Sequence, residues 1–351
     1  MNTLTIAIAA YNIGSFIGEC LDSVLAQTNR SFSLLVINDG SSDQTAQILA
    51  QYAQENSCMQ VIHQENQGIC SVRNAMIAHC QTDYLWMIDG DDLITLTAVA
   101  EILPCLDGER EAIYFTHTAY GQADTRTLTG TVQDLTPSQL QALRYKCMLN
   151  DKEPAIQQIN VNSSVMSVHK VETLRLHQIA FPLGWQCGED VMFTLQFLQK
   201  AKYVAYLDSA LYLYRVNEGS ISLRYNATFV ETNLQWLAYL KTLIPAEDAH
   251  MQSLFLGRVL GTSCSALFLD ISHPHNPKSY FVRRKEFKQL IQSDIVKHAL
   301  AHCPTTLLRR NVKIARICMK LRLFCIANLF AHVIMYKRYT VFRAHGGRIQ
   351  A

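Results

Sequence analysis

An acidic cluster follows an apolar run near residue 90. The run Tyr84-Leu85-Trp86-Met87-Ile88 leads directly into Asp89-Gly90-Asp91-Asp92. Three carboxylates within four residues repel one another, and core packing gives no reason for them. A hard divalent cation relieves this repulsion, because Mg²⁺ and Mn²⁺ take oxygen ligands and commonly share their remaining positions with water and substrate phosphates. The cluster therefore predicts a Mn²⁺ or Mg²⁺ site, with a solvated acidic turn as the alternative.

The elements that position this cluster alternate between strand and helix. Continuous apolar runs predict strands at 4–9, 32–37, 59–63 and 84–88, and apolar residues at helical spacing predict helices at 15–27, 44–55 and 70–79. Asp43 is the expected N-cap of the second helix. Apolar strands separated by helices are typical of a parallel sheet covered on both faces. The predicted fold class is α/β, a Rossmann-like, mostly parallel sheet flanked by helices.

Polar residues follow each of the four predicted strands. The segments are Tyr11-Asn12, residues 38–43 (Asn-Asp-Gly-Ser-Ser-Asp), Asn66-Gln67-Gly68 and the acidic cluster. Ligands of open α/β sheets bind at the carboxyl ends of the strands. We therefore expect all four segments to line one edge of the sheet.

The rest of the chain is less regular at first and then helical. Periodicity is weak between residues 113 and 168, where only 161–168 resembles a strand. Glu189-Asp190 precedes a helix that reaches about Lys200, and short strands are expected at 204–207 and 211–216. After Ser222 the pattern is helical to the end. We predict a catalytic domain at 1–225 and a helical C-terminal region at 226–351.

Composition excludes several classes of protein. Hydrophobic residues at 49% and charged residues at 17% indicate a folded chain of 351 residues. The eleven cysteines include no Cys-x-x-Cys pair, which argues against a zinc site or disulfide framework and favours a reducing cytosol. We expect the N-terminal residues to form a strand and not a signal peptide, and no window has the roughly 20 uncharged apolar residues of a spanning helix. P-loop and Gly-x-Gly-x-x-Gly motifs are absent.

Five ordered motifs resemble the inverting glycosyltransferases of family 2, which have the GT-A fold. The resemblance covers roughly residues 3–222, and each motif alone is weak evidence. They are Ala9-Ala10-Tyr11-Asn12, residues 38–43, Asn66-x-Gly68 with Arg73-Asn74, Asp89-x-Asp91-Asp92, and Glu189-Asp190. The resemblance implies a nucleotide-sugar half at about 1–110 and an acceptor half at about 111–225. It also implies bacterial surface-polysaccharide, capsule or lipopolysaccharide assembly as the setting.

The resemblance implies a donor site at the sheet edge. Asp39 takes the position that binds uracil, since a carboxylate accepts from the N3–H of that base; a simple turn is the alternative. Arg73 is expected to contact the nucleotide, or else to pair with Asp39 or Asp43. Arg215, in Tyr214-Arg215-x-x-x-x-Ser220-x-Ser222, is expected to reach the diphosphate, with a surface arginine as the alternative. The remaining donor-binding positions are Ala10, Tyr11, Asn12, Asn66, Gly68, Asp89 and Gly90.

The resemblance also assigns a metal and a base. Asp91 is the first expected metal ligand and Asp89 assists, so that the metal acts as a Lewis acid on the leaving diphosphate. Asp92 supports these ligands or caps a helix at 95–103. Asp190 is the expected base for the acceptor hydroxyl, and Glu189 binds or orients the acceptor; alternatively the two acids only complement a helix dipole. Trp185 is expected to be a sugar platform or a core residue.

The C-terminal tail is strongly basic. Residues 295–351 contain eleven Lys or Arg and no acid, whereas residues 1–294 contain 20 basic and 29 acidic residues, a balance of −9. Helical spacing places one set of cations beside one set of apolar residues, namely Arg309, Lys313, Arg316 and Lys320 beside Ile314, Ile317, Leu321 and Phe324. We predict peripheral contact of residues 309–343 with an anionic membrane. Packing on the catalytic domain and a homodimer contact are the alternatives, and sparse aromatic residues argue against nucleic acid.

Together these features predict a cytoplasmic enzyme, peripheral on the inner face of the plasma membrane. It would transfer a hexosyl or N-acetylhexosaminyl group from a nucleotide-sugar, expected to be UDP-linked, to a hydroxyl of a glycan or lipid-linked glycan, and form a β-glycosidic bond. One alternative is a non-catalytic membrane-associated sugar-nucleotide-binding protein. The other is a nucleotidyltransferase, but residues 9–12 lack its Gly-rich basic loop.

Overall fold

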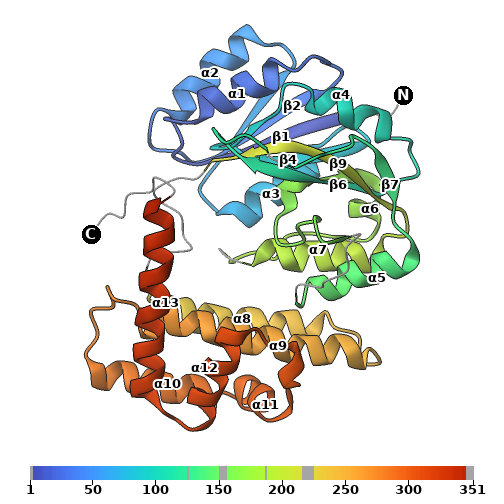
Figure 1. Ribbon diagram of the computed structural model, residues 1–351. Helices are drawn as coiled ribbons and strands as arrows, with labels where there is room; N and C mark the ends of the chain where they lie inside the picture. The colour runs from blue at the N-terminus through green and yellow to red at the C-terminus, as the bar shows by residue number, and fades with distance from the viewer. Residues whose placement is uncertain (1–2, 125, 150–155, 186–187, 216–224, 345–351) are drawn as a thin grey trace. The chain divides into compact units, whose positions relative to one another are not determined.

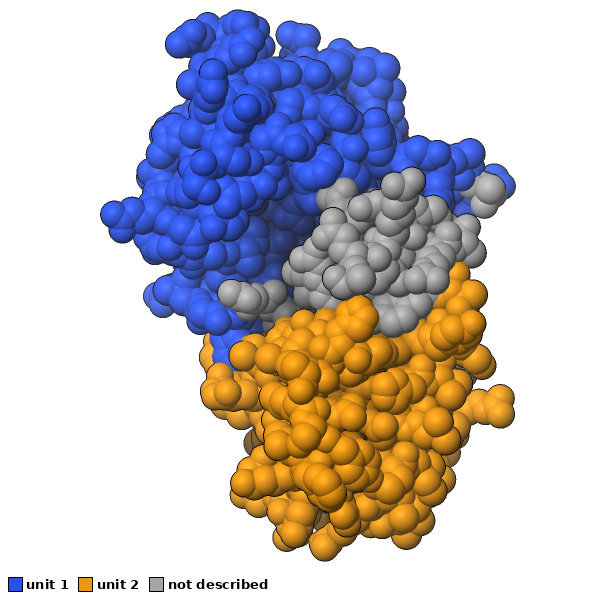
Figure 2. Space-filling model, turned by 90° about the vertical axis from the view of Figure 1, so that its left-hand side faces the viewer, with its two compact units in different colours: residues 1–147, 151–215 blue, residues 148–150, 216–351 orange. Residues whose placement is uncertain are grey.

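The chain divides into two compact units. The computed structural model describes residues 3–124, 126–149, 156–185, 188–215 and 225–344. Unit 1 comprises residues 1–147 and 151–215, and unit 2 comprises residues 148–150 and 216–351 (Figure 2).

Unit 1 is built on one mixed sheet. Its strands are β1 (Leu4–Ala10), β2 (Ser33–Asp39), β3 (Met59–Gln64), β4 (Tyr84–Asp89), β5 (Leu93–Ile94), β6 (Ala112–Ala119), β7 (Val132–Asp134), β8 (Ser167–Lys170) and β9 (Val204–Tyr214). Its helices are α1 (Ile17–Leu25), α2 (Thr45–Glu55), α3 (Ile69–His79), α4 (Ala98–Ile102), α5 (Pro137–Lys146), α6 (Val171–Leu176) and α7 (Glu189–Lys200).

The order of the strands is β3-β2-β1-β4-β8-β6-β9-β5, and β7 also pairs with β9. The first four of these strands are parallel, as the alternation of strand and helix predicts. β8 is antiparallel to both of its neighbours, β4 and β6, whereas β6 and β9 are parallel. The predicted α/β class is confirmed, and the carboxyl ends of β1 to β4 lie at one edge of the sheet.

Helices cover both faces of this sheet. Figure 1 shows α1, α2 and α4 on one face and α3, α5, α6 and α7 on the other. Because successive strand residues point to opposite faces, Leu4, Ile6 and Ile8 of β1 pack in one core cluster with Leu21 and Val24 of α1. All five are completely buried. The continuous apolar runs in the sequence therefore reflect a sheet that is buried on both sides.

Several predicted boundaries were wrong. The expected strand at 161–168 is a short 3₁₀ turn, Ser164–Met166, followed by β8. The expected strands at 204–207 and 211–216 are one strand, β9, and position 216 lies outside the described residues. The helix expected at 95–103 shortens to α4, and Gln44 occupies the N-cap position of α2 that we expected for Asp43. β6, β7, α5 and α6 lie in regions where the apolar pattern is irregular, and were not predicted.

Unit 2 is helical, as expected. Its helices are α8 (Phe229–Thr242), α9 (Ala249–Ala266), α10 (Tyr280–Gln292), α11 (Asp294–His302), α12 (Arg310–Lys320) and α13 (Phe324–Ala344), and a π-helical segment, Leu267–Ile271, extends α9. α9 contacts α8, α11 and α12, and Figure 1 shows α8 and α9 side by side. The helix Ala249–Ile271 is long and apolar enough to cross a membrane, but 72% of its apolar window is buried, which also fits a core helix.

Candidate active site

The loops after β1 and β2 are joined by hydrogen bonds. The Asn12 amide N–H donates to Ser41 Oγ (3.1 Å), and Asn12 Oδ1 accepts from the Ser42 amide (2.8 Å). Asn12 has a φ of 50°, a left-handed conformation that asparagine tolerates better than most residues. The Gly14 amide donates to Asp43 Oδ2 (2.9 Å), so Asp43 ties the loops together. These bonds fix the edge of the sheet where the sequence predicts the donor.

Asp39 holds the loop between β3 and α3. Its Oδ1 accepts from Gln64 Nε2 (2.7 Å) and the Gln67 amide (3.0 Å), and its Oδ2 accepts from the Gly68 amide (2.9 Å). Gly68 has a φ of 85° at the N-cap of α3, a conformation that favours glycine. A carboxylate has about four lone-pair positions, so three bonds leave one for a further donor. The side chain is almost completely buried, at 2% exposure.

Two glycines allow backbone segments to meet at this edge. A Cβ on Gly40 would lie 2.8 Å from the Asn66 amide nitrogen, which brings the loop after β2 onto the loop after β3. A Cβ on Gly90 would lie 2.6 Å from the Ala9 carbonyl oxygen, and the Gly90 amide donates to that oxygen (3.0 Å). The acidic cluster is therefore held directly against the end of β1.

The first strand also carries two predicted donor residues. Ala10 is buried and pairs with Asn38 of β2, so only its backbone is near the edge. Tyr11 follows it and is 50% exposed. Of the two, Tyr11 has the side chain that can reach a bound nucleotide.

Asp92 is a buried acceptor for β9. Its Oδ2 accepts from the Tyr212 hydroxyl (2.6 Å), and its Oδ1 accepts from the Arg215 amide (2.7 Å). Burial raises the pKa of the Asp92 carboxyl to about 7. The alternative in which Asp92 caps the following helix was wrong, because α4 begins at Ala98 and has Thr97 at its N-cap position. No local sequence signal identifies Tyr212, which lies 120 residues from its partner.

Arg215 fastens the end of β9 to the acidic cluster. Its Nε donates to the Asp91 carbonyl oxygen (2.9 Å), and its Nη2 donates to Glu19 Oε2 (2.8 Å). The guanidinium also lies over the Tyr120 ring, 4.6 Å from its centroid. The side chain is only 13% exposed, so the surface-arginine alternative was wrong. Ser220 and Ser222 of the same motif lie outside the described residues.

Arg73 stands between three carboxylates. Its Nη1 donates to Asp190 Oδ1 (2.7 Å) and Glu189 Oε1 (3.2 Å), and its Nη2 donates to Asp89 Oδ1 (3.3 Å). The Arg73 side chain is 5% exposed. These acids come from β4 and from α7, over a hundred residues later in the chain. The predicted alternative, an ion pair with Asp39 or Asp43, was wrong.

The acid pair Glu189-Asp190 opens α7. The preceding Gly188 has a φ of 83°, which sets the turn into the helix. Asp190 Oδ1 also accepts from the Ser164 amide (3.3 Å), and its side chain is 17% exposed. Glu189 is more buried; burial, and then the charge of Asp190, raises the pKa of Glu189, and Glu189 Oε2 has no hydrogen-bond partner. The Asp190 carboxylate is therefore the more accessible of the two.

Trp185 lies just before this turn. It is half-buried, and its carbonyl oxygen accepts from Cys70 Sγ (3.2 Å). The contact places Trp185 beside the start of α3, the helix that also carries Arg73. Its role as a sugar platform stays a prediction.

Asp89 and Asp91 are the carboxylates suited to a metal. The Asp89 side chain is 37% exposed and Arg73 occupies one of its oxygens, whereas Asp91 is half-buried. Over the described residues, no group of three His, Cys, Asp or Glu could hold a metal by itself. Two carboxylates that leave positions for water and phosphate fit Mg²⁺ or Mn²⁺ in a nucleotide site. They do not fit a closed structural site of the zinc type.

A mixed sheet with this acidic edge, and a second acid pair brought to it by Arg73, defines a glycosyltransferase of the GT-A fold. The family model described as "Glycosyl transferase family 2" matches residues 5–158, so this part of the chain is similar to that family. The protein is therefore a glycosyltransferase.

Relatives and solved structures agree with this assignment. "Uncharacterized glycosyltransferase EpsJ" of Bacillus subtilis (strain 168) is 25% identical over 93% of this chain and 95% of its own length. "Putative glycosyltransferase EpsH" of the same organism is 27% identical over 66% of each chain. The crystal structure of S. aureus TarS 1–349 in complex with UDP-GlcNAc matches 99% of this chain and 93% of that chain, with a TM-score of 0.65 and 18% identity. The last likeness shows the fold alone.

Proposed function

We propose that this glycosyltransferase moves a hexosyl or N-acetylhexosaminyl group from a UDP-sugar to a hydroxyl of a glycan or lipid-linked glycan, with inversion to a β-glycosidic bond. The observation that carries the proposal is the contact of Arg73 with Asp89 on one side and with Asp190 on the other. Through it, an acid of the donor edge and an acid suited to base catalysis surround one guanidinium. The UDP-GlcNAc complex of TarS supports a UDP-linked donor.

On the donor side, Asp39 is the proposed contact to the base. Its one remaining lone-pair position accepts the uracil N3–H, while its bonds to the 64–68 loop keep the carboxylate in place. Tyr11, Asn12, Asn66 and Gly68 border the same edge. Asp89 and Asp91 would hold Mn²⁺ or Mg²⁺, which supplies Lewis-acid stabilisation to the departing diphosphate. Arg215 adds a positive charge beside them, because its Nε is bonded to the Asp91 carbonyl.

On the acceptor side, Asp190 is the proposed base. Both of its hydrogen bonds use Oδ1, so Oδ2 is the oxygen available to an acceptor hydroxyl. As that hydroxyl oxygen bonds to the anomeric carbon, the bond from this carbon to the diphosphate oxygen breaks. Asp190 receives the proton and the nucleoside diphosphate leaves with the bonding electrons. Glu189 Oε2, which has no partner, can accept a hydrogen bond from a second acceptor hydroxyl.

The cellular setting is part of the proposal. The basic residues of 309–343 support peripheral binding to the anionic inner face of the plasma membrane. An enzyme held there would meet lipid-linked intermediates of bacterial surface polysaccharides. The side chains of Arg338 and Arg343, which belong to the predicted contact, lie outside what the structure describes.

A thermal-shift panel tests the donor. UDP-GlcNAc, UDP-GalNAc, UDP-glucose and GDP-mannose are compared with and without Mn²⁺. A donor at a hundred times its Kd should stabilise the folded protein by about 2.7 kcal/mol, and chelation should remove the effect. Equal shifts with UDP- and GDP-linked sugars, or no shift with any donor, would contradict the proposed donor class.

Analysis of the reaction products distinguishes a glycosyltransferase from a nucleotidyltransferase and from a non-catalytic binding protein. A glycosyltransferase releases UDP when acceptor or water is glycosylated, whereas a nucleotidyltransferase would release or consume pyrophosphate. The match to the glycosyltransferase family model favours the first reaction over the second and over a non-catalytic binding protein. Metal-dependent UDP release is the expected result, and turnover that produces pyrophosphate would refute it.

A further inference from the structure

Helices α12 and α13 expose a row of large apolar side chains. Ile317 on α12 is 57% exposed, and Leu321 directly after α12 is 62% exposed. Leu329 and Tyr336 on α13 are 66% and 74% exposed. Spacings of three and four residues place such side chains on one side of each helix. We call this set the apolar face; its other members are Ile314, Ile326 and Val333.

The structure changes the surface that the sequence predicts. Phe324 is buried, at 3% exposure, and is not part of the apolar face. Arg316 is also buried, because its guanidinium donates to the Leu300 carbonyl oxygen (2.9 Å) and to Thr305 Oγ1 (3.0 Å). Of the other cations predicted for this surface, Arg309 and Lys320 are exposed and Lys313 is half-buried.

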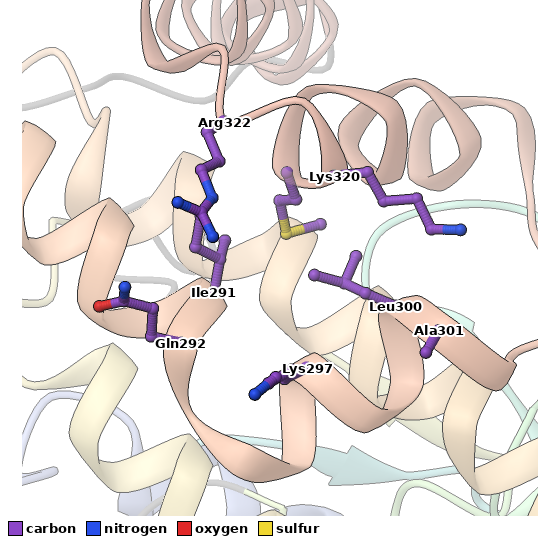
Figure 3. Close-up of a pocket in the computed structure, with 8 residues that line it drawn as sticks. Ile291, Gln292, Lys297, Leu300, Ala301, Lys320 and Arg322 are labelled. Atoms are coloured by element: carbon purple, nitrogen blue, oxygen red, sulfur yellow. The ribbon is translucent and has the colours of Figure 1, made fainter.

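A pocket of about 540 Å³ lies between the end of α10, α11 and the end of α12. Its floor is apolar, and three exposed cations line it, namely Lys297, Lys320 and Arg322. Figure 3 shows Arg322 extending from the turn after α12 toward Ile291, with Lys297 on the opposite rim. We call this the basic pocket.

The charge of the basic pocket is uncompensated. None of its three cations forms an ion pair with any residue in the described part of the chain. Cations at Lys320 and Arg322 also complement the partial negative end of α12, but this effect does not account for Lys297 on a different helix. Three cations around one cavity favour an anion with several oxygen acceptors, such as a phosphate.

The turn that ends α12 fixes the backbone at Arg322. Arg322 has a φ of 56°, in a position after a helix where glycine or asparagine is usual. This conformation closes α12 in a Schellman motif, in which the Leu323 amide donates to the Cys318 carbonyl oxygen (2.9 Å) and the Arg322 amide donates to the Met319 carbonyl oxygen (3.2 Å). Here the left-handed residue is one that lines the basic pocket.

The basic pocket and the apolar face meet in the turn after α12. Lys320 and Arg322 line the pocket, while Leu321 and Leu323, which alternate with them, are 62% and 38% exposed. We infer that unit 2 binds an anionic phospholipid of a bilayer, with its phosphate in the basic pocket and the apolar face among the acyl chains. This inference rests on the membrane contact proposed above and does not depend on the transfer reaction.

Vesicle flotation of the full chain tests the basic pocket. Vesicles of phosphatidylcholine with and without phosphatidylglycerol are compared for the wild type, for K297Q/K320Q/R322Q and for a control, R284Q/K285Q/K288Q, which removes three exposed cations of α10. Loss of three interfacial cations should weaken binding to the anionic vesicles roughly a hundredfold. The control should retain most of the binding. Equal losses in the two variants would overturn the pocket and leave only general charge attraction.

The apolar face has its own control. I317Q/L321Q/L329Q should lose binding to the anionic vesicles, whereas F281Q, at a 77% exposed position on α10, should not. Since all four side chains are exposed, the variants should fold; circular dichroism checks this. Equal binding by both variants would contradict insertion of the apolar face.

Two further outcomes separate this inference from its basis. If the wild type bound to no vesicle, both the proposed membrane contact and the lipid site would be refuted. The transfer reaction would still be tested separately, by UDP release with a soluble acceptor. Inorganic phosphate or pyrophosphate that stabilises the wild type but not K297Q/K320Q/R322Q, without vesicle binding, would identify a site for soluble anions and overturn the lipid assignment.

Discussion

At the scale of single residues, the most important contact is that of Arg73, whose one positive charge faces three carboxylates. Its side chain is nearly inaccessible to water. One partner, Asp89, belongs to the proposed donor site, and the other two, Glu189 and Asp190, belong to the proposed acceptor site. Removing one member of a buried ionic network leaves an uncompensated charge, which is strongly destabilising. Arg73 is therefore a positioning residue, since it sets where the acids lie without requiring contact with substrate.

Substitution of Arg73 should separate charge from geometry. R73K keeps the charge but cannot donate in three directions from a planar group, so we expect kcat for UDP release to fall about a hundredfold and its pH profile to move. R73A should also lower the free energy of unfolding by roughly 3–5 kcal/mol. R110K, at an ion pair with the largely exposed Asp134, is the control. Wild-type kcat and pH profile in R73K would argue against this role.

Substitutions of Asp190 and Asp91 should affect sugar transfer and nucleotide binding differently. D190N keeps the size of the side chain but removes the base, so transfer should fall by about 10²–10⁴-fold while UDP still stabilises the protein in the presence of Mn²⁺. D91N should lose both transfer and the metal-dependent part of the stabilisation by UDP. Thermal shift and UDP release, measured on the same preparations, give both quantities. The assignments would be reversed if D190N abolished the metal effect.

The sequence located individual candidate residues better than it located their contacts. Asp39, Asp89 and Asp91 stand at strand ends, and the parallel topology brings these ends together. Arg73 and Asp92 could not be understood locally, because each is paired with residues more than a hundred positions away. Burial of a polar side chain depends on such distant partners, and a linear pattern does not contain them.

At the scale of elements, Gly90 controls how closely β4 approaches β1. A Cβ there would lie 2.5 Å from Ile13 Cδ1 and 2.6 Å from the Ala9 carbonyl oxygen. G90A should therefore destabilise the protein by about 1–3 kcal/mol and disturb the adjacent acids. G261A in the middle of α9 is the matched control, because nothing lies within 4 Å of its added Cβ and alanine favours a helix. The measurement is the midpoint of thermal unfolding of the wild type, G90A and G261A. An equal change in both variants would exclude the close approach of the two strands as the cause.

The π-helical segment after α9 contains a buried carboxylic acid, Asp270. Asp270 is 3% exposed; its Oδ2 accepts from the Val230 amide at 3.4 Å, and its Oδ1 has no partner. Burial raises the pKa of Asp270 from 3.8 to about 6. Between pH 4 and pH 6 the folded state therefore keeps a proton that the unfolded state has lost, so this group's contribution to stability decreases as pH rises through that window.

Replacement of Asp270 should remove this pH dependence. D270N should raise stability at pH 8, on the order of 2 kcal/mol, and change it little at pH 4, where Asp270 is already neutral. D294N, at an exposed position on α11, should have no such effect. Urea unfolding at the two pH values provides the measurement. A gain of the same size at both would contradict the shifted pKa as its cause.

Strands and helices could be predicted from the sequence where the pattern of apolar residues was regular. The fully buried strands β1, β2 and β4 appear as continuous apolar runs, whereas β6 begins apolar and ends in half-buried residues. α5 had a usable signal that apolar periodicity missed: Thr136 and Gln139 form a capping box, and Pro137 occupies the first turn. Apolar periodicity missed α5 because its polar residues are spread around the helix and do not leave one apolar side.

At the scale of the whole molecule, charge is divided along the chain. Residues 295–351 contain only basic charges, whereas the rest has a balance of −9. Attraction of the basic part to anionic lipid is screened within about 10 Å at 0.1 M salt. Raising salt should therefore release the protein from phosphatidylglycerol vesicles, while stabilisation by UDP with Mn²⁺ persists. Retention at high salt would indicate that apolar insertion alone is sufficient.

The position of β8 has a consequence for how the chain folds. β1 to β4 use residues 4–89 and can pair as soon as these residues have left the ribosome. β4 receives its other neighbour only with β8, which ends at Lys170, 81 residues after Asp89. β6 must wait still longer for β9. Long-range pairing is slow and leaves strand edges exposed, so a nascent chain carries an open edge at β4 until β8 has been made.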